Sequence, residues 1–220
     1  MFSKRTALSV LFVLLISLNF IMCSNEIKAH EIFYDGYGPA FNPIPVSWHH
    51  KSSGKAHLRI SNSGLSKTYA DQYSTVRNAW ISSTSKISIT TVPNTQSTVD
   101  MVTTTKDYWD RQFNGIDALL VLGYANLVTT DDVLLKTPVD AKSSSKSIAY
   151  ASVFLTPYDN NMSTNVRRAL MVHELGHVLG LGHPDSIYYP TNVSSIMRSQ
   201  VTGHYYIPQS HDINDINTKY

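Results

Sequence analysis

The segment that decides the fold and the chemistry of this chain is His-Glu-Leu-Gly-His-Val-Leu-Gly-Leu-Gly-His, residues 173–183. Residues four positions apart lie on the same face of a helix, so His173 and His177 can direct ring nitrogens at one ion. Gly180 can adopt the left-handed conformation that ends a helix, which would let His183 return as a third ligand. Three protein ligands leave one tetrahedral position open, as in catalytic zinc sites.

Glu174 follows the first histidine directly and is not needed as a ligand. We therefore predict His173, His177 and His183 as the metal ligands and Glu174 as the general base that acts on a zinc-bound water. The short form of the motif, His-Glu-x-x-His, also occurs by chance in helices that bind no metal. The additional glycine and third histidine make such a coincidence much rarer.

Residues 163–179 carry the signals of one continuous helix around this motif. Ser163 and Thr164 offer side-chain hydroxyls as N-caps, and neither Gly nor Pro occurs before Gly176. Gly176 inside a helix costs about 1 kcal/mol relative to Ala. This glycine therefore indicates a close approach by another backbone or side chain.

Residues 152–220 resemble the metzincin zinc metallopeptidases. Among these, they are most similar to the matrixins (the matrix metalloproteinase type), and the chain resembles a secreted, bacterial-type member. Residues 173–183 match the extended zinc signature of metzincins. Ser194-Ser195-Ile196-Met197 is similar to their Met-turn, and residues 210–220 are similar to the closing helix of matrixins. The resemblance implies that Met197 lies beneath the zinc site as a packing floor and is not a ligand.

The fold that this resemblance implies is a zincin-like α+β fold. It has a twisted mixed β-sheet with two long helices, and a small C-terminal subdomain after His183 that holds the Met-turn and the closing helix. The expected elements before the zinc helix are strands at residues 57–61, 87–92, 99–104, 118–128 and 148–156, and a helix at residues 68–82. In this family a strand at the rim of the cleft binds the substrate as an added strand, and residues 148–156 or 123–125 are the candidates.

The chain departs from the matrixin pattern in three places. No cysteine-bearing pro-segment is present, so a thiolate–zinc switch is not expected. Pro and Tyr do not follow Met197 closely, and the wall of the main specificity pocket is predicted to come from residues 205–208 (Tyr-Tyr-Ile-Pro) instead. His211 stands where the first of two acidic residues usually falls.

The 220-residue chain is 42% apolar and 15% charged, which suits one globular domain. Residues 1–29 predict a signal peptide, because Lys4 and Arg5 precede a short apolar run. Residues 30–220 would then be the catalytic domain, with residues 30–53 as an extended N-terminal arm or, alternatively, a short pro-segment over the cleft. We expect a secreted, extracellular monomer without stable membrane association after signal cleavage. Removal of residues 1–29 would bring the net charge from +2 to zero, which favours no nucleic-acid partner.

Two further groups of residues were weighed as metal sites. His49, His50 and His57 lie close in sequence, but paired surface histidines are common and no acidic residue is near. Oxygen ligands of the kind that Ca²⁺ prefers occur at Asp131-Asp132, Asp140 and Asp159-Asn160-Asn161. None of these matches a loop of defined ligand spacing, so solvated loop acids are the alternative to a structural calcium.

The sequence therefore predicts a secreted zinc endopeptidase that hydrolyses peptide bonds of a protein or peptide substrate with a water activated by Glu174. Two alternatives stay open. One is a zinc hydrolase that acts on a non-peptide amide, and the other is a secreted binding module with an inert zinc site.

Overall fold

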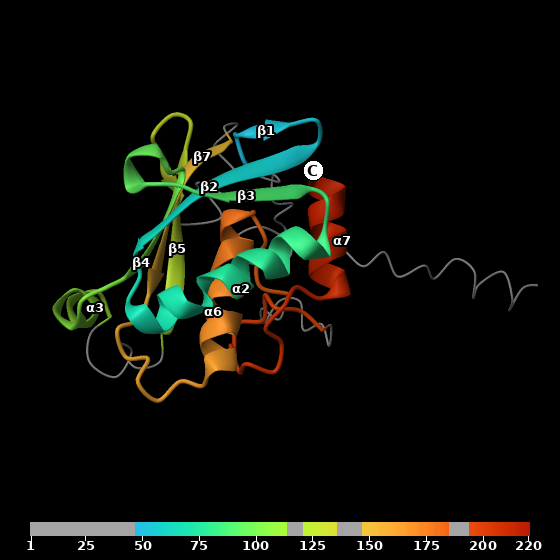
Figure 1. Ribbon diagram of the computed structural model, residues 1–220. Helices are drawn as coiled ribbons and strands as arrows, with labels where there is room; N and C mark the ends of the chain where they lie inside the picture. Colours follow the sequence, from blue (N-terminus) through green and yellow to red (C-terminus); the bar gives the residue numbers. More distant parts are fainter. Residues whose placement is uncertain (1–46, 114–120, 136–146, 185–193) are drawn as a thin grey trace, which may run out of the picture.

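The computed structural model describes residues 47–113, 121–135, 147–184 and 194–220, which form a mixed β-sheet and four α-helices (Figure 1). The strands are β1 (Lys51–Ser52), β2 (Lys55–Gly64), β3 (Ile87–Thr91), β4 (Val99–Thr103), β5 (Gly123–Thr129), β6 (Leu134–Leu135) and β7 (Ile148–Leu155). The helices are α2 (Lys67–Ser83), α3 (Lys106–Gln112), α6 (Thr164–Val178) and α7 (Ser210–Lys219), with a 3-10 turn, η1, at Asn94–Gln96.

The sheet has the strand order β1-β2-β4-β7-β5-β6, and β3 pairs with β2 beside this path. Strands β2, β4 and β7 run parallel to one another, whereas β5 is antiparallel to β7. The sheet is therefore mixed. It confirms the expected α+β class with a mixed sheet and two long helices, which are α2 and α6.

The core lies where α2 and α6 pack against one face of the sheet (Figure 1). Alternate residues of β2 (Ala56, Leu58 and Ile60) and of β7 (Ala151, Val153 and Leu155) are buried, as expected for strands with one covered face. Trp80 of α2 is fully buried, and its indole N–H donates to the carbonyl of Val172 in α6 at 3.0 Å. This bond fixes the two long helices against each other at the level of the histidine motif.

Most expected elements occur near their predicted ranges. The short strands β1 and β6 were not predicted, and β5 covers Gly123–Thr129 of the strand expected at residues 118–128, of which 118–120 lie outside the described residues. Three other differences follow. The first strand is longer than predicted, because β2 covers Lys55–Gly64 and not only residues 57–61. Helix α3 was not predicted. Its N-cap is Thr105, whose hydroxyl accepts from the backbone N–H of Tyr108 at 3.3 Å, and its one buried residue, Trp109, packs beside the Tyr124 ring of β5.

The third difference concerns the strand expected at the rim. The candidate at residues 148–156 is wrong, because β7 pairs with β4 on one side and with β5 on the other. A strand with neighbours on both sides has no backbone groups left for an added strand. Among the described residues, β6 pairs only with Leu127 and Val128 of β5, so Gly123–Asn126 keep an open edge. The second candidate, residues 123–125, lies on that edge.

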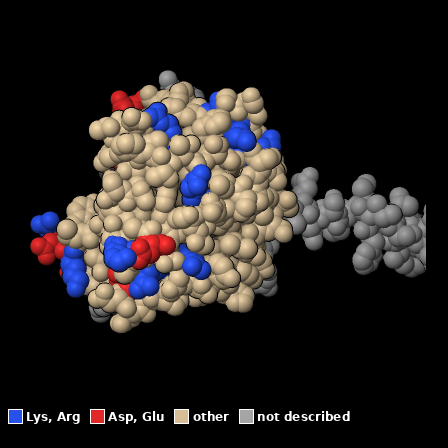
Figure 2. Space-filling model, in the orientation of Figure 1, with Lys and Arg blue, Asp and Glu red and all other residues tan. Residues whose placement is uncertain are grey.

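The predicted signal peptide and most of the predicted arm lie outside the described residues. The last part of the arm is described: Trp48 forms a bridge with Ile148, and Lys51–Ser52 form β1. No helix in the described ranges is long and apolar enough to cross a membrane. On the face in Figure 2, uncharged side chains cover most of the surface, and basic and acidic side chains lie in small separate groups.

Candidate metal centre

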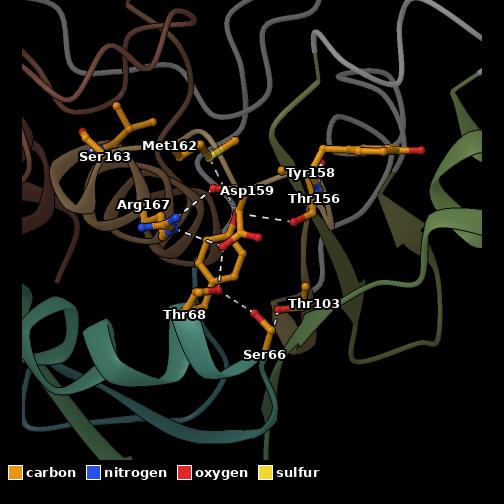
Figure 3. A network of polar contacts seen from close by, with 11 residues as sticks. Ser66, Thr68, Thr103, Thr156, Tyr158, Asp159, Met162, Ser163 and Arg167 are labelled. Atoms are coloured by element: carbon orange, nitrogen blue, oxygen red, sulfur yellow. Dashed lines mark hydrogen bonds and ion pairs between the residues drawn. The ribbon is translucent and has the colours of Figure 1, made fainter.

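Helix α6, which carries the histidine motif, begins at the predicted cap. The Ser163 hydroxyl accepts from the backbone N–H of Val166 at 3.2 Å. The loop before the cap is held by Asp159, a buried carboxylate that accepts from Arg167 Nε at 3.0 Å and from the Thr68 hydroxyl at 2.5 Å (Figure 3). Arg167 Nη2 also donates to the Asp159 carbonyl at 2.8 Å. This network joins the start of α6 to the start of α2.

The structure brings the three predicted ligands together. Their Nε2 atoms form a nearly equilateral triangle, with 3.1 Å from His173 to His177, 3.1 Å from His173 to His183 and 3.2 Å from His177 to His183. Tetrahedral zinc with Zn–N bonds of 2.0–2.1 Å requires about 3.3 Å between ligand nitrogens. The triangle is within about 0.2 Å of this requirement, so the three imidazoles fit a zinc ion.

The other ring nitrogens determine which tautomer faces the centre of the triangle. His173 Nδ1 lies 2.9 Å from the Ile196 carbonyl, and His177 Nδ1 lies 2.8 Å from the Leu181 carbonyl. A carbonyl only accepts, so each Nδ1 must carry the hydrogen, and each Nε2 presents a lone pair in the neutral ring. Lone pairs at about 3 Å from one another repel unless a cation or a proton lies among them. The arrangement is therefore that of a cation site.

Gly180 turns the chain as predicted. Its φ angle is +84°, in the left-handed region, and its N–H donates to the His177 carbonyl at 2.8 Å. The N–H of Leu181 donates to the Gly176 carbonyl at 2.9 Å, which completes a Schellman motif at the end of α6. This reversal lets His183 reach the two histidines of the helix.

The close approach predicted at Gly176 is made by Met197. A Cβ atom on Gly176 would overlap the Met197 sulfur and would lie 3.0 Å from its methyl carbon. Met197 is fully buried, and it packs against the helix between the two ligand positions His173 and His177. This contact agrees with the role of packing floor that the resemblance implied for this methionine.

Asp212 is a residue of the site that the sequence analysis missed. It is fully buried in the first turn of α7, and its carboxylate accepts from the Ser195 hydroxyl at 2.6 Å and from the Ile196 N–H at 3.0 Å. The carbonyl of Ile196 is the acceptor for His173. Asp212 therefore fixes the turn that orients a predicted ligand. The available signal was the acid at position 212 in the run that resembles the closing helix, but its partners lie 16 and 17 residues away.

The carboxylate of Glu174 is buried against β5. A Cβ atom on Gly123 would lie 2.8 Å from Glu174 Oε1, so this glycine leaves the space that the carboxylate occupies. Among the described residues, Glu174 Oε2 has no hydrogen-bond partner. Burial raises the pKa of the carboxyl from 4.5 to about 8. An acidic group with an unsatisfied buried oxygen is typical of functional sites, where a ligand or substrate completes its bonding.

The other predicted metal sites gain no support from the geometry. His57 Nε2 lies 2.8 Å from the Ser52 hydroxyl, and His50 Nε2 lies 3.2 Å from the Ala149 carbonyl. In the described ranges, the histidines and acids that converge as a ligand group are His173, His177 and His183. The Asp159 carboxylate is engaged by Arg167 and Thr68, and Asp140 lies outside the described residues. A calcium site stays a prediction.

A cavity of about 290 Å³ lies beside the histidine centre, between α6 and the segment that follows the Met-turn. Ala169 lines it one helical turn before His173, and Ile196, the acceptor of His173, lines it from the other side. Tyr205, which was predicted in the wall of the specificity pocket, also lines this cavity, whereas residues 206–208 do not. The remaining lining includes Arg198, Val201 and His204.

Together these features define an α+β domain with a candidate three-histidine metal centre formed by its second long helix and the turn that follows it. No protein-family model matches the chain, and no curated protein matches its sequence. It is similar, at 13% identity, to two structures of myroilysin. The first has a TM-score of 0.43 and covers 76% of this chain and 95% of that chain. The second has a TM-score of 0.45 and covers 88% of this chain and 92% of that chain. It is also similar to high choriolytic enzyme 1, a hatching enzyme zinc-protease from the medaka fish Oryzias latipes, at 13% identity and a TM-score of 0.46, covering 84% of this chain and 96% of that chain. These values describe a distant likeness.

Proposed function

We propose that the protein is a zinc-dependent endopeptidase of the metzincin type, with His173, His177 and His183 as zinc ligands and Glu174 as the general base. The observation that carries the proposal is the triangle of three Nε2 atoms, which lie 3.1–3.2 Å from one another. A buried glutamate, Glu174, directly follows the first of these histidines in the chain. When bound at this site, zinc supplies a Lewis acid that polarises the substrate carbonyl and lowers the pKa of water.

The protein itself would supply the proton transfers of the reaction. Glu174 takes a proton from the attacking water and passes it to the leaving amine. Burial of the carboxylate keeps competing water away from the proton that is transferred.

The open edge of β5 supports a peptide as the substrate. Among the described residues, no strand pairs with the outer side of Gly123–Asn126, and Gly123 lies against the Glu174 carboxylate. An extended peptide paired with this edge would bring its backbone past the proposed base. We propose that the cavity between Ala169 and Tyr205 receives one side chain of this peptide, because it lies beside the ligand His173.

The decisive experiment compares Glu174→Gln with the unchanged protein. We expect the variant to bind about one zinc per chain, while hydrolysis of denatured protein and mixed peptides falls by several orders of magnitude. Unchanged hydrolysis would refute the role of Glu174. His183→Ala should lose zinc affinity and activity together, and full retention of zinc would exclude His183 as a ligand.

Two outcomes of the same experiment would favour the alternatives. Zinc binding without cleavage of any peptide, but with hydrolysis of small amides, would indicate a non-peptide amide hydrolase. Zinc binding without hydrolysis of either would indicate a binding module with an inert site. We further propose export after removal of residues 1–29, which sequencing of the N-terminus of the secreted protein tests, and a monomer, which sedimentation tests.

A further inference from the structure

The turn that joins α6 to His183 carries three successive backbone carbonyls in a buried part of the domain. The N–H groups of Gly180 and Leu181 are used within the Schellman motif, so they close the helix end but do not attach it to the rest of the domain. The carbonyls of Leu179, Gly180 and Leu181 point to other partners. The hydrogen-bond donors to these carbonyls therefore fix the position of the turn, and with it the position of His183.

Each of these carbonyls receives a side-chain donor. The Tyr220 hydroxyl donates to Leu179 at 3.1 Å, Lys219 Nζ donates to Gly180 at 3.1 Å, and the His177 ring donates to Leu181 at 2.8 Å. Two of the three donors are thus the residues at the end of α7, about 40 positions away in sequence. The third is itself one of the proposed zinc ligands.

Tyr220 connects this turn to the sheet as well. Its hydroxyl accepts from the backbone N–H of Trp48 at 3.1 Å, and Trp48 is a fully buried residue that bridges to Ile148 at the start of β7. The hydroxyl therefore uses both its donor and its acceptor capacity on backbone groups from two segments. Tyr220 is itself 9% exposed, so these bonds are shielded from water.

The same helix holds the other side of the centre through its first turn, where Asp212 binds the Met-turn. Helix α7 thus contacts both the segment before His183 and the segment that orients His173. Figure 1 shows α7 standing beside the end of α6. A single helix that fixes both the turn before His183 and the turn that orients His173 can hold the ring nitrogens of these two histidines at a set separation.

We propose that Lys219 and Tyr220 are positioning residues for the metal centre, which hold the Leu179–Leu181 turn so that His183 meets the two helix histidines. This inference rests on the proposed zinc site. Ligand orientation through backbone and side-chain hydrogen bonds affects metal affinity, and the loss of one such contact typically weakens it by 10- to 100-fold.

The test compares Tyr220→Phe and Lys219→Met with a matched control, Tyr73→Phe. Tyr73 is also a buried tyrosine, and its hydroxyl lies 3.2 Å from the Thr91 hydroxyl at the end of β3, a partner outside the Leu179–Leu181 turn. The zinc dissociation constant is measured by competition with a chelator, and the d–d absorption of the cobalt-loaded protein reports the ligand geometry. The melting temperature of the metal-free protein is recorded in parallel.

We expect Tyr220→Phe and Lys219→Met each to raise the zinc dissociation constant by about tenfold and to change the cobalt spectrum. Tyr73→Phe should lower the melting temperature without changing the dissociation constant. Lys219→Arg, which keeps a side-chain N–H donor, should restore part of the affinity lost in Lys219→Met. A merely structural role would lower the melting temperature in all variants and leave zinc affinity unchanged.

Two results are distinguishable. If the unchanged protein binds no zinc, the proposed function fails before any variant is compared. If it binds zinc and the dissociation constants of Tyr220→Phe and Lys219→Met stay within twofold of it, only the positioning role is overturned.

Discussion

Replacement of Asp212 should be among the most damaging single changes in this domain. Its carboxylate accepts from the Ser195 hydroxyl at 2.6 Å, from the Ile196 N–H at 3.0 Å and from the Gln209 N–H at 2.7 Å. A hydrogen bond to a charged group contributes about 1.5–3 kcal/mol, and bonds that share one carboxylate are not additive. We therefore expect Asp212→Ala to lower the free energy of unfolding by about 3–5 kcal/mol.

Asp212→Asn gives an intermediate case. The amide oxygen can still accept from the two backbone N–H groups, but the amide nitrogen cannot accept from Ser195. The expected loss is about 1–2 kcal/mol. Because Ile196 accepts from His173, both variants should also weaken zinc binding, by about tenfold or more.

The assay is urea unfolding of the metal-free protein, followed by chelator competition for zinc. Asp71→Ala is the control, because Asp71 pairs with Lys67 at 2.9 Å on the surface, with side chains that are 54% and 86% exposed. Such a pair contributes at most about 0.5 kcal/mol. The reasoning is refuted if Asp212→Ala loses no more stability than Asp71→Ala.

Three further predictions concern the base, the metal and pH. Gly123→Ala would place a Cβ atom 2.8 Å from Glu174 Oε1, so kcat/KM should fall about 10- to 100-fold while zinc content stays constant; parallel loss of zinc would contradict this. Zinc at 100 times its Kd should stabilise the domain by about 2.7 kcal/mol and raise Tm by roughly 5–10 °C, and an unchanged Tm in the presence of a chelator would show that no site binds. Burial lowers the pKa of Lys219 from 10.5 to about 7, although Asp215 opposes the shift. Between pH 7 and 10.5, the unfolded chain then binds a proton at Lys219 that the folded chain does not bind. The difference in unfolding free energy between the unchanged protein and Lys219→Met should therefore rise with pH across that window. A difference that stays constant or falls would argue against the lowered pKa.

The parts of the site that were predictable depend on local spacing. The helical face of His173 and His177, the cap at Ser163 and the turn at Gly180 each follow from residues within about one or two helical turns of one another. The structure reproduces them because no distant contact is needed to specify them.

The parts that were not predictable depend on contacts between distant segments. The roles of Asp212 and Tyr220 arise only when α7 packs beside the Met-turn and the end of α6, and the sequence around each residue carries no sign of its partner. The wrong expectation for residues 148–156 has the same origin, because the order of strands in a sheet is set by pairing over long separations. Helix α3 is short, and its stability comes from Trp109 packing on β5 rather than from a long periodic pattern.

The open edge of β5 has a consequence for which proteins such an enzyme would attack. Pairing along Gly123–Asn126 engages main-chain groups, which every polypeptide has in common, so it discriminates poorly between amino-acid types. It does require several consecutive residues to be drawn out straight. Unfolded tails, denatured chains and long surface loops meet that demand, whereas tightly folded globular targets must first come apart locally, and their own resistance to opening would limit the rate of degradation.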